Sequence, residues 1–301
     1  AIMADRALEK QHAYEVAFEK ARKSLDAGDI ADAITHVKDA RKIHGFERNP
    51  DVIELCRRIG RKAHTKEYNG AWLNRMIAGH ADAVLSVSIS PNGKFAVSGS
   101  KDKTIRVWKI EDGECFKVLE GHTGDVNCLA FAEDGRNFIS GGSDGAIRLW
   151  DFIKGECAIA FKKQTSPVHT VSLSPDIAYA VSGDDDGLVK LWNVKTGELK
   201  RKYEGHLSQV TSACFSHDML FILSASTDHS IKLWDIRRGL CYQNLEKHNS
   251  RVESVCLSAD DRLALSGGWG RKVILWDLTT GKCLREFVGH VRSEERRVGK
   301  A

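Results

Sequence analysis

The sequence predicts an all-β protein of five four-stranded sheets, preceded by a small α-helical hairpin. Three observations lead to this prediction. Tryptophan, valine and serine recur with an unbroken period of 42 residues, and each copy contains short β-rich runs between turn residues. Residues 5–64 instead show helical spacing. The recurring residues are Trp108, Trp150, Trp192, Trp234 and Trp276; Val84, Val126, Val168, Val210 and Val252; and Ser98, Ser140, Ser182, Ser224 and Ser266.

The strands of one copy can be placed from local pattern alone. In the first copy, the β-rich runs are residues 84–90, 95–99 and 105–110. Pro91, Asn92 and Gly93 lie between the first two runs and predict a hairpin turn, because Asn and Gly accept the positive φ that such turns need. In the second copy, residues 147–150 alternate apolar and polar side chains, which indicates a strand.

Two dipeptides mark the ends of each copy. Gly-His stands early and Trp-Asp late, and with a period of 40–45 residues this pattern is typical of one propeller blade. Residues 79–290 therefore resemble the WD-repeat family, which implies a β-propeller of five blades. Lys247-His248, Trp108-Lys109 and Trp192-Asn193 depart from the dipeptides. The matching pairs begin at Gly79, Gly121, Gly205 and Gly289, and at Trp150, Trp234 and Trp276.

Five blades predict an incomplete ring. Closed propellers contain about four to eight blades, and the resemblance implies seven as the commonest number. An open ring exposes strand edges, which can pair with another chain, so edge-to-edge self-association is expected. Residues 73–78 are expected to be the outer strand of a neighbouring blade.

The resemblance also implies a role for the repeated His, Ser, Asp and Trp. In that family the four side chains form a buried, hydrogen-bonded tetrad, and burial explains why each polar group needs a partner. A tetrad of this kind exposes no nucleophile, so catalysis by these groups is not expected. The complete tetrads are His80, Ser98, Asp102 and Trp108; His122, Ser140, Asp144 and Trp150; and His206, Ser224, Asp228 and Trp234.

Blades three and five depart from the tetrad. Gln164 replaces the His of blade three, where Asp186 is the expected tetrad carboxylate, and Gly270 replaces the Asp of blade five. A buried group that loses its partner costs about 1–3 kcal/mol, so these blades are expected to be the less stable ones.

Positions that fail to repeat are the candidates for partner binding, because loops vary without disturbing the sheet. Trp269 is the outlier of its turn: it is either an exposed anchor for a partner, or it packs over a neighbouring blade and fills the space left by Gly270. Asp184 and Asp185 either meet a basic partner or are merely solvated. The predicted partner-binding face comprises Trp269, Arg251, Gln209, Asp125, Asp184, Asp185 and Lys101.

The two ends of the chain differ from the repeats. Residues 1–64 predict helices at 6–27 and 30–43, which loosely resemble a tetratricopeptide repeat, and a third short helix from Pro50. Residues 65–72 are the expected linker and 73–290 the blades. Residues 291–301 lack a strand pattern and resemble sequencing-adapter read-through, so this tail is expected to be non-native and the natural protein longer.

Composition restricts the function classes. Residues 71–290 carry equal numbers of basic and acidic side chains, so no nucleic-acid partner is expected. No apolar run is long enough for a membrane span. The eight cysteines include no Cys-x-x-Cys pair, and those that recur at equivalent positions predict small buried strand residues in a reducing cytoplasm.

These observations predict a non-catalytic scaffold or adaptor for other proteins or peptides, with no cofactor and no metal. Phosphate-binding loops and zinc-protease motifs do not occur in the sequence. The alternative is a regulatory or targeting fragment of a larger signalling enzyme, such as a protein kinase, whose catalytic domain lies upstream.

Overall fold

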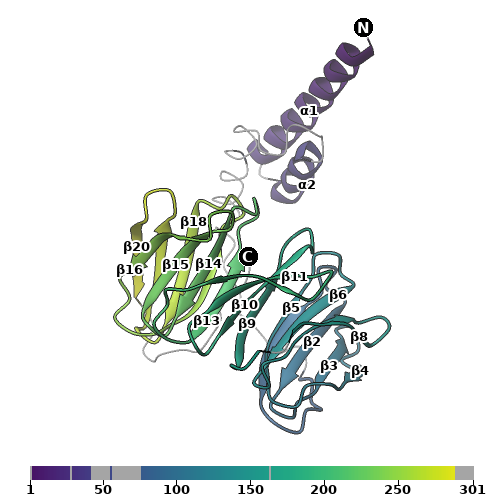
Figure 1. Cartoon of the computed structure of the whole chain (residues 1–301). Coiled ribbons are helices and arrows are strands. Elements are labelled where there is room, and N and C mark those ends of the chain that lie inside the picture. The colour runs from purple at the N-terminus through teal and green to yellow at the C-terminus, as the bar shows by residue number, and fades with distance from the viewer. Residues whose placement is uncertain (1, 28, 42–54, 56–75, 163, 289–301) are drawn as a thin grey trace. The chain divides into compact units, whose positions relative to one another are not determined.

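The computed structural model describes residues 2–27, 29–41, 55, 76–162 and 164–288 (Figure 1). The chain divides into two compact units, residues 1–74 and 75–301. The expected linker 65–72, the tail 291–301 and all of the third helix except Leu55 lie outside the described residues.

The first unit contains two helices, α1 (Ile2–Asp26) and α2 (Ile30–Arg41). Asp29 immediately precedes α2, and its carboxylate accepts a hydrogen bond from the Asp32 amide (3.1 Å) and so caps the helix N-terminus. The helical hairpin expected here is therefore present, whereas its tetratricopeptide character remains a prediction. Its small apolar core consists of Tyr14, Ala21, Leu25, Ala33, Val37, Ala40 and Leu55.

The second unit contains five antiparallel sheets of four strands each, as the 42-residue period predicts. Each sheet is one blade, with its four strands paired in chain order: β1–β4, β5–β8, β9–β12, β13–β16 and β17–β20 (Figure 1). The strand bounds are β1 (Val84–Ile89), β2 (Phe95–Ser100), β3 (Ile105–Lys109), β4 (Cys115–Leu119), β5 (Val126–Phe131), β6 (Asn137–Gly142), β7 (Ile147–Asp151), β8 (Glu156–Ala160), β9 (Val168–Leu173), β10 (Tyr179–Asp184), β11 (Val189–Asn193), β12 (Leu199–Tyr203), β13 (Val210–Phe215), β14 (Phe221–Ser226), β15 (Ser230–Asp235), β16 (Cys241–Glu246), β17 (Val252–Leu257), β18 (Leu263–Gly268), β19 (Lys272–Asp277) and β20 (Lys282–Val288).

The turn between the first two strands of blade one follows the sequence prediction. Gly93 has a φ of 68°, and its amide donates to the Ser90 carbonyl (2.8 Å). The Ser90 hydroxyl donates to Asn92 Oδ1 (2.7 Å) and accepts from the Phe95 amide (3.0 Å). Side-chain hydrogen bonds thus replace ladder bonds where the chain reverses.

The apolar core lies between blades rather than within them. Between blades one and two, Val97, Ile105 and Val107 pack against Val126 and Leu129. The same register positions meet at the next three boundaries. Glycine on the second strand makes this approach possible, since a Cβ on Gly99 would lie 2.6 Å from Val126 Cγ1.

Two sequence expectations differ from the structure. Of the strand expected over residues 73–78, residues 76–78 form none, because no described strand pairs with them, and residues 73–75 lie outside the described residues. The recurring cysteines Cys115, Cys157 and Cys241 are exposed rather than buried, since each lies on the fourth strand of its sheet, at the edge opposite the core-forming first strand. Of the described helices, none is long and apolar enough to cross a membrane.

Candidate functional site

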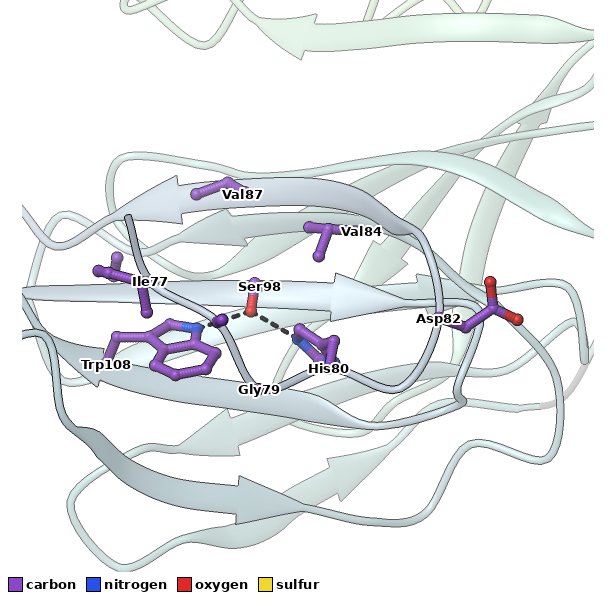
Figure 2. Close-up of a pocket in the computed structure, with 10 residues that line it drawn as sticks. Ile77, Gly79, His80, Asp82, Val84, Val87, Ser98 and Trp108 are labelled. Atoms are coloured by element: carbon purple, nitrogen blue, oxygen red, sulfur yellow. Dashed lines mark hydrogen bonds between the residues drawn. The ribbon is translucent and has the colours of Figure 1, made fainter. Parts of the chain in front are cut away.

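Blade one brings its predicted tetrad together. Trp108 Nε1–H donates to Ser98 Oγ (2.7 Å), which lies 2.7 Å from His80 Nε2 (Figure 2). His80 Nδ1 lies 2.7 Å from Asp102 Oδ2. All four groups are satisfied if the imidazole carries its proton on Nδ1, donates it to the carboxylate and accepts from the serine hydroxyl at Nε2.

Blades two and four repeat this arrangement. Ser140 accepts from Trp150 and Ser224 from Trp234, at 2.8 and 2.7 Å. The corresponding His–Ser distances are both 2.8 Å, and the His–Asp distances are 3.1 and 2.9 Å. The residues are His122, Ser140, Asp144 and Trp150 in blade two, and His206, Ser224, Asp228 and Trp234 in blade four.

The tetrad aspartates also hold the chain that enters each blade. Asp102, Asp144 and Asp228 accept from the backbone amides of Ala81, Thr123 and Leu207 (3.0, 2.8 and 2.9 Å). Each carboxylate thereby joins the entering loop to the turn between the second and third strands. The tetrad therefore fixes loop positions at one end of the blade.

Electrostatics keeps these aspartates charged. Burial alone raises the pKa of Asp144, but hydrogen bonds from Thr123, Ala146 and His122 outweigh it and hold the pKa below its usual range. The same balance lowers the pKa values of Asp102 and Asp228. Burial lowers the pKa of His122, which favours the neutral imidazole that the hydrogen-bond chain requires.

Blade three replaces the tetrad with a buried ion pair. Lys190 Nζ contacts Asp184 Oδ2 and donates to Gln164 Oε1 (2.5 Å). Asp184 is fully buried, which corrects its expected place on the partner-binding face. Asp186, the expected tetrad carboxylate, is instead exposed, because blade three has no histidine to receive it. Trp192 still donates to Ser182 (2.9 Å).

Blade five keeps part of the tetrad. His248 Nε2 lies 2.7 Å from Ser266 Oγ, which also accepts from Trp276 Nε1–H (2.7 Å). Gly270 provides no carboxylate for the other imidazole nitrogen. Burial lowers the pKa of His248 to about 4.

The predicted partner-binding positions meet in pairs along a rim. In every blade, the amide of the turn residue donates to the carbonyl of the residue just before the first strand, at 2.8–3.1 Å. The term rim is used below for these five turn residues together with the five residues whose carbonyls they contact. The pairs are Lys101 with Ala83, Ser143 with Asp125, Asp185 with Pro167, Thr227 with Gln209, and Trp269 with Arg251.

Trp269 is the aromatic residue of the rim. It is 39% exposed, and the Arg251 guanidinium stacks 3.4 Å from the centre of its ring. Arg251 Nε also lies 2.8 Å from Glu253 Oε1. One face of the indole thus packs on Arg251 of its own blade, not on a neighbouring blade, while part of its surface meets solvent. A role as an anchor for a partner stays a prediction.

Polar contacts link blades three and four along the rim. Asp185 Oδ1 accepts from Gln209 Nε2 (3.1 Å) and lies 3.1 Å from His169 Nε2. Lys101 is exposed and Asp125 partly exposed, but neither side chain joins this group. Sequence reasoning missed His169, Glu253 and Lys190. His169 and Glu253 are each the second residue of their strand, a position that the prediction of partner binding did not include. Lys190 sits at a strand position where blades one, two and four carry partly exposed cations, Arg106, Arg148 and Lys232.

Comparison with protein-family models agrees with this geometry. The SPT8 beta propeller model matches residues 124–295, more than half of the chain, and the model of the WD domain, G-beta repeat, matches residues 72–109. The chain belongs to the WD-repeat, SPT8-type β-propeller family. The resemblance drawn from the repeated dipeptides is thereby confirmed.

Curated relatives match over a single repeat. Ribosome biogenesis protein BOP1 homologs of Drosophila melanogaster, Drosophila willistoni and Drosophila erecta are each 50% identical over 42 residues. That stretch is 14% of this chain and 5% of each relative. A match of one repeat length reflects the blade that WD-repeat propellers share.

Proposed function

We propose that this WD-repeat propeller is a scaffold or adaptor that presents its rim to partner proteins or peptides and performs no catalysis of its own. The observation that carries the proposal is the Trp269–Arg251 stack on blade five. A partly exposed tryptophan on a backbone-anchored turn is the type of residue that dominates protein interfaces. WD-repeat propellers typically act through protein contacts.

The surroundings of Trp269 favour a protein partner over a nucleic acid. Arg251 is paired with Glu253, and the rim carries two carboxylates, Asp125 and Asp185, for its two cations, Lys101 and Arg251. Phosphate binding needs unpaired cations along a strip. A mixed polar rim around one aromatic anchor instead resembles a protein–protein contact.

Chemistry in the tetrads is not part of this proposal. Each serine oxygen of the complete tetrads already accepts from tryptophan and lies within hydrogen-bond distance of the imidazole.

The proposal includes a reducing compartment such as the cytoplasm, because the seven cysteines in the described ranges are all free thiols.

The test compares two aromatic truncations of the full chain as affinity baits. Trp269→Ala removes the proposed anchor, whereas Phe116→Ala removes a ring of nearly equal exposure, 40%, on the outer strand of blade one. Lys109 and Lys117 lie over the Phe116 ring, so both rings have a cationic neighbour.

We expect proteins retained by the wild-type chain to be lost from the Trp269→Ala bait and kept by the Phe116→Ala bait. Truncating an interface anchor costs about 2 kcal/mol or more, roughly a thirtyfold loss of affinity. Equal retention by both variants would show that Trp269 is not the anchor.

A further inference from the structure

Within residues 76–288, the face of blade one that points away from blade two is not covered by another blade. Val87 is 56% exposed, whereas Leu129, Val171, Ala213 and Val255 at the same register are 5–6% exposed. Val84 is 48% exposed, whereas its four counterparts are fully buried. Next to these valines is a hollow of about 330 Å³, lined also by Ala96 and Trp108 (Figure 2).

Blade five has the complementary uncovered face. Phe287 is 43% exposed, whereas Leu119, Phe161, Tyr203 and Leu245 at its register are 0–5% exposed. Leu265, Val273 and Leu275 are also partly exposed, although the corresponding residues of blades one to four are buried. The uncovered surfaces are therefore sheet faces, not the strand edges expected of an open ring.

These two faces are the two halves of one repeated interface. Between blades one and two, Val97, Ile105, Val107 and Leu119 of the earlier blade form a single core with Val126, Leu129 and Trp150 of the later one. Adding four periods of 42 to the first group gives Leu265, Val273, Leu275 and Phe287. Subtracting one period from the second group gives Val84, Val87 and Trp108.

Two finer features show the same complementarity. The valine that begins each later blade sits against a glycine or alanine of the earlier one, as Val126, Val168 and Val210 do against Gly99, Gly141 and Gly183. The residues at these two positions on the exposed faces of blades one and five are Val84 and Gly267. A side-chain hydroxyl on the first strand of the earlier blade also accepts a hydrogen bond from a backbone amide on the first strand of the later blade, as Ser86 Oγ does from the Leu129 amide (3.0 Å).

We propose that a second copy of this chain docks its blade-one face onto the blade-five face of the first, which places Val84 of one copy against Gly267 of the other. The contact joins different surfaces, so a docked pair leaves one blade-one face and one blade-five face free. Because the two surfaces differ, further copies can add to the free face at either end of the pair.

Sedimentation velocity of the full chain over a range of concentrations tests the proposal. We expect the weight-average mass of the wild type to rise with concentration. Val87→Asp disables one face and Phe287→Asp the other, so each variant alone is expected to stay monomeric. An equimolar mixture retains one competent pair of faces and is expected to reach twice the monomer mass and no more.

The control is Ile153→Asp, because Ile153 is 59% exposed, at least as much as Val87 and Phe287, but lies on a turn outside both faces. It is expected to associate like the wild type. A wild type that stays monomeric at all concentrations, single variants that still associate, or a mixture that stays monomeric would each overturn the proposal. None of the three positions is part of the rim, so a failed rim experiment leaves this result unaffected.

Discussion

The buried pair of Lys190 and Asp184 allows a sharp stability prediction. Lys190→Met keeps the aliphatic volume of the side chain but removes the ammonium group that contacts Asp184 and Gln164. Asp184 is fully buried, so its carboxylate would lose its ion-pair partner without gaining contact with water.

The magnitude follows from what Asp184 retains. Breaking a buried ion pair by removing one partner costs about 3–5 kcal/mol. The backbone amides of Asp186 and Leu188 still donate to Asp184 Oδ1, at 3.1 and 2.9 Å, so we expect the lower end of that range, about 3 kcal/mol.

The assay is urea-induced unfolding of the full chain, followed by tryptophan fluorescence. Lys232→Met is the matched control: it lies at the same register in blade four, and its ammonium binds Asn244 at the surface (3.0 Å). A surface replacement of this kind changes the free energy of unfolding by about 0.5 kcal/mol at most.

A double variant distinguishes two causes of destabilisation, the loss of the ion-pair partner of Asp184 and the loss of side-chain packing at Lys190. Lys190→Met with Asp184→Ser removes both charges and installs the residue that blades one and four carry, where Ser100 and Ser226 are buried and donate to backbone carbonyls. We expect it to recover to within about 1 kcal/mol of the wild type, because well-packed neutral replacements of buried pairs are often tolerated. A Lys190→Met chain as stable as the Lys232→Met control would refute the reasoning.

Two further predictions concern pH and packing. The pKa of His248 is about 4 when folded and 6.5 when unfolded, so the unfolded chain binds the extra proton between these values. Stability should therefore fall as pH drops from about 6.5 to 4, and His248→Gln should make that fall shallower; an unchanged slope in pH-dependent thermal unfolding would contradict this. Gly141→Val should cost about 1–3 kcal/mol, because a Cβ there would lie 2.6 Å from Val168 of the next blade. Gly267→Val, at the same register on the uncovered face, should cost less, and equal losses in urea unfolding would count against the interface described between blades.

The sequence predicted the five blades because their determinants repeat. The tryptophan, serine and valine of each copy recur at a fixed period, so a strand assignment shifted by one residue would have disagreed with all five copies at once. The hydrogen-bond partners in blades one, two and four follow from the same register. Blade three could not be predicted this way, since Lys190 shares its register with the partly exposed cations Arg106, Arg148 and Lys232. It is buried in blade three, where Gln164 replaces the histidine.

The rim was harder to predict than the core. Its backbone pairs follow from the register, but the stack of Arg251 on Trp269 depends on side-chain directions that no periodicity specifies. The exposure of cysteines on the fourth strands was mispredicted for a related reason. Recurrence at equivalent positions indicates a shared place in the blade, and that place can be at the outer edge as well as in the core.

The amide–carbonyl bond that closes each rim turn has a consequence for how binding preferences change. The five bonds are nearly equal in length although the residues making them range from Lys101 and Ala83 to Trp269 and Arg251. Main-chain atoms thus set the height and spacing of the rim, while side chains are free to differ. A change of partner can therefore proceed one substitution at a time, with each intermediate sequence still folding to the same frame.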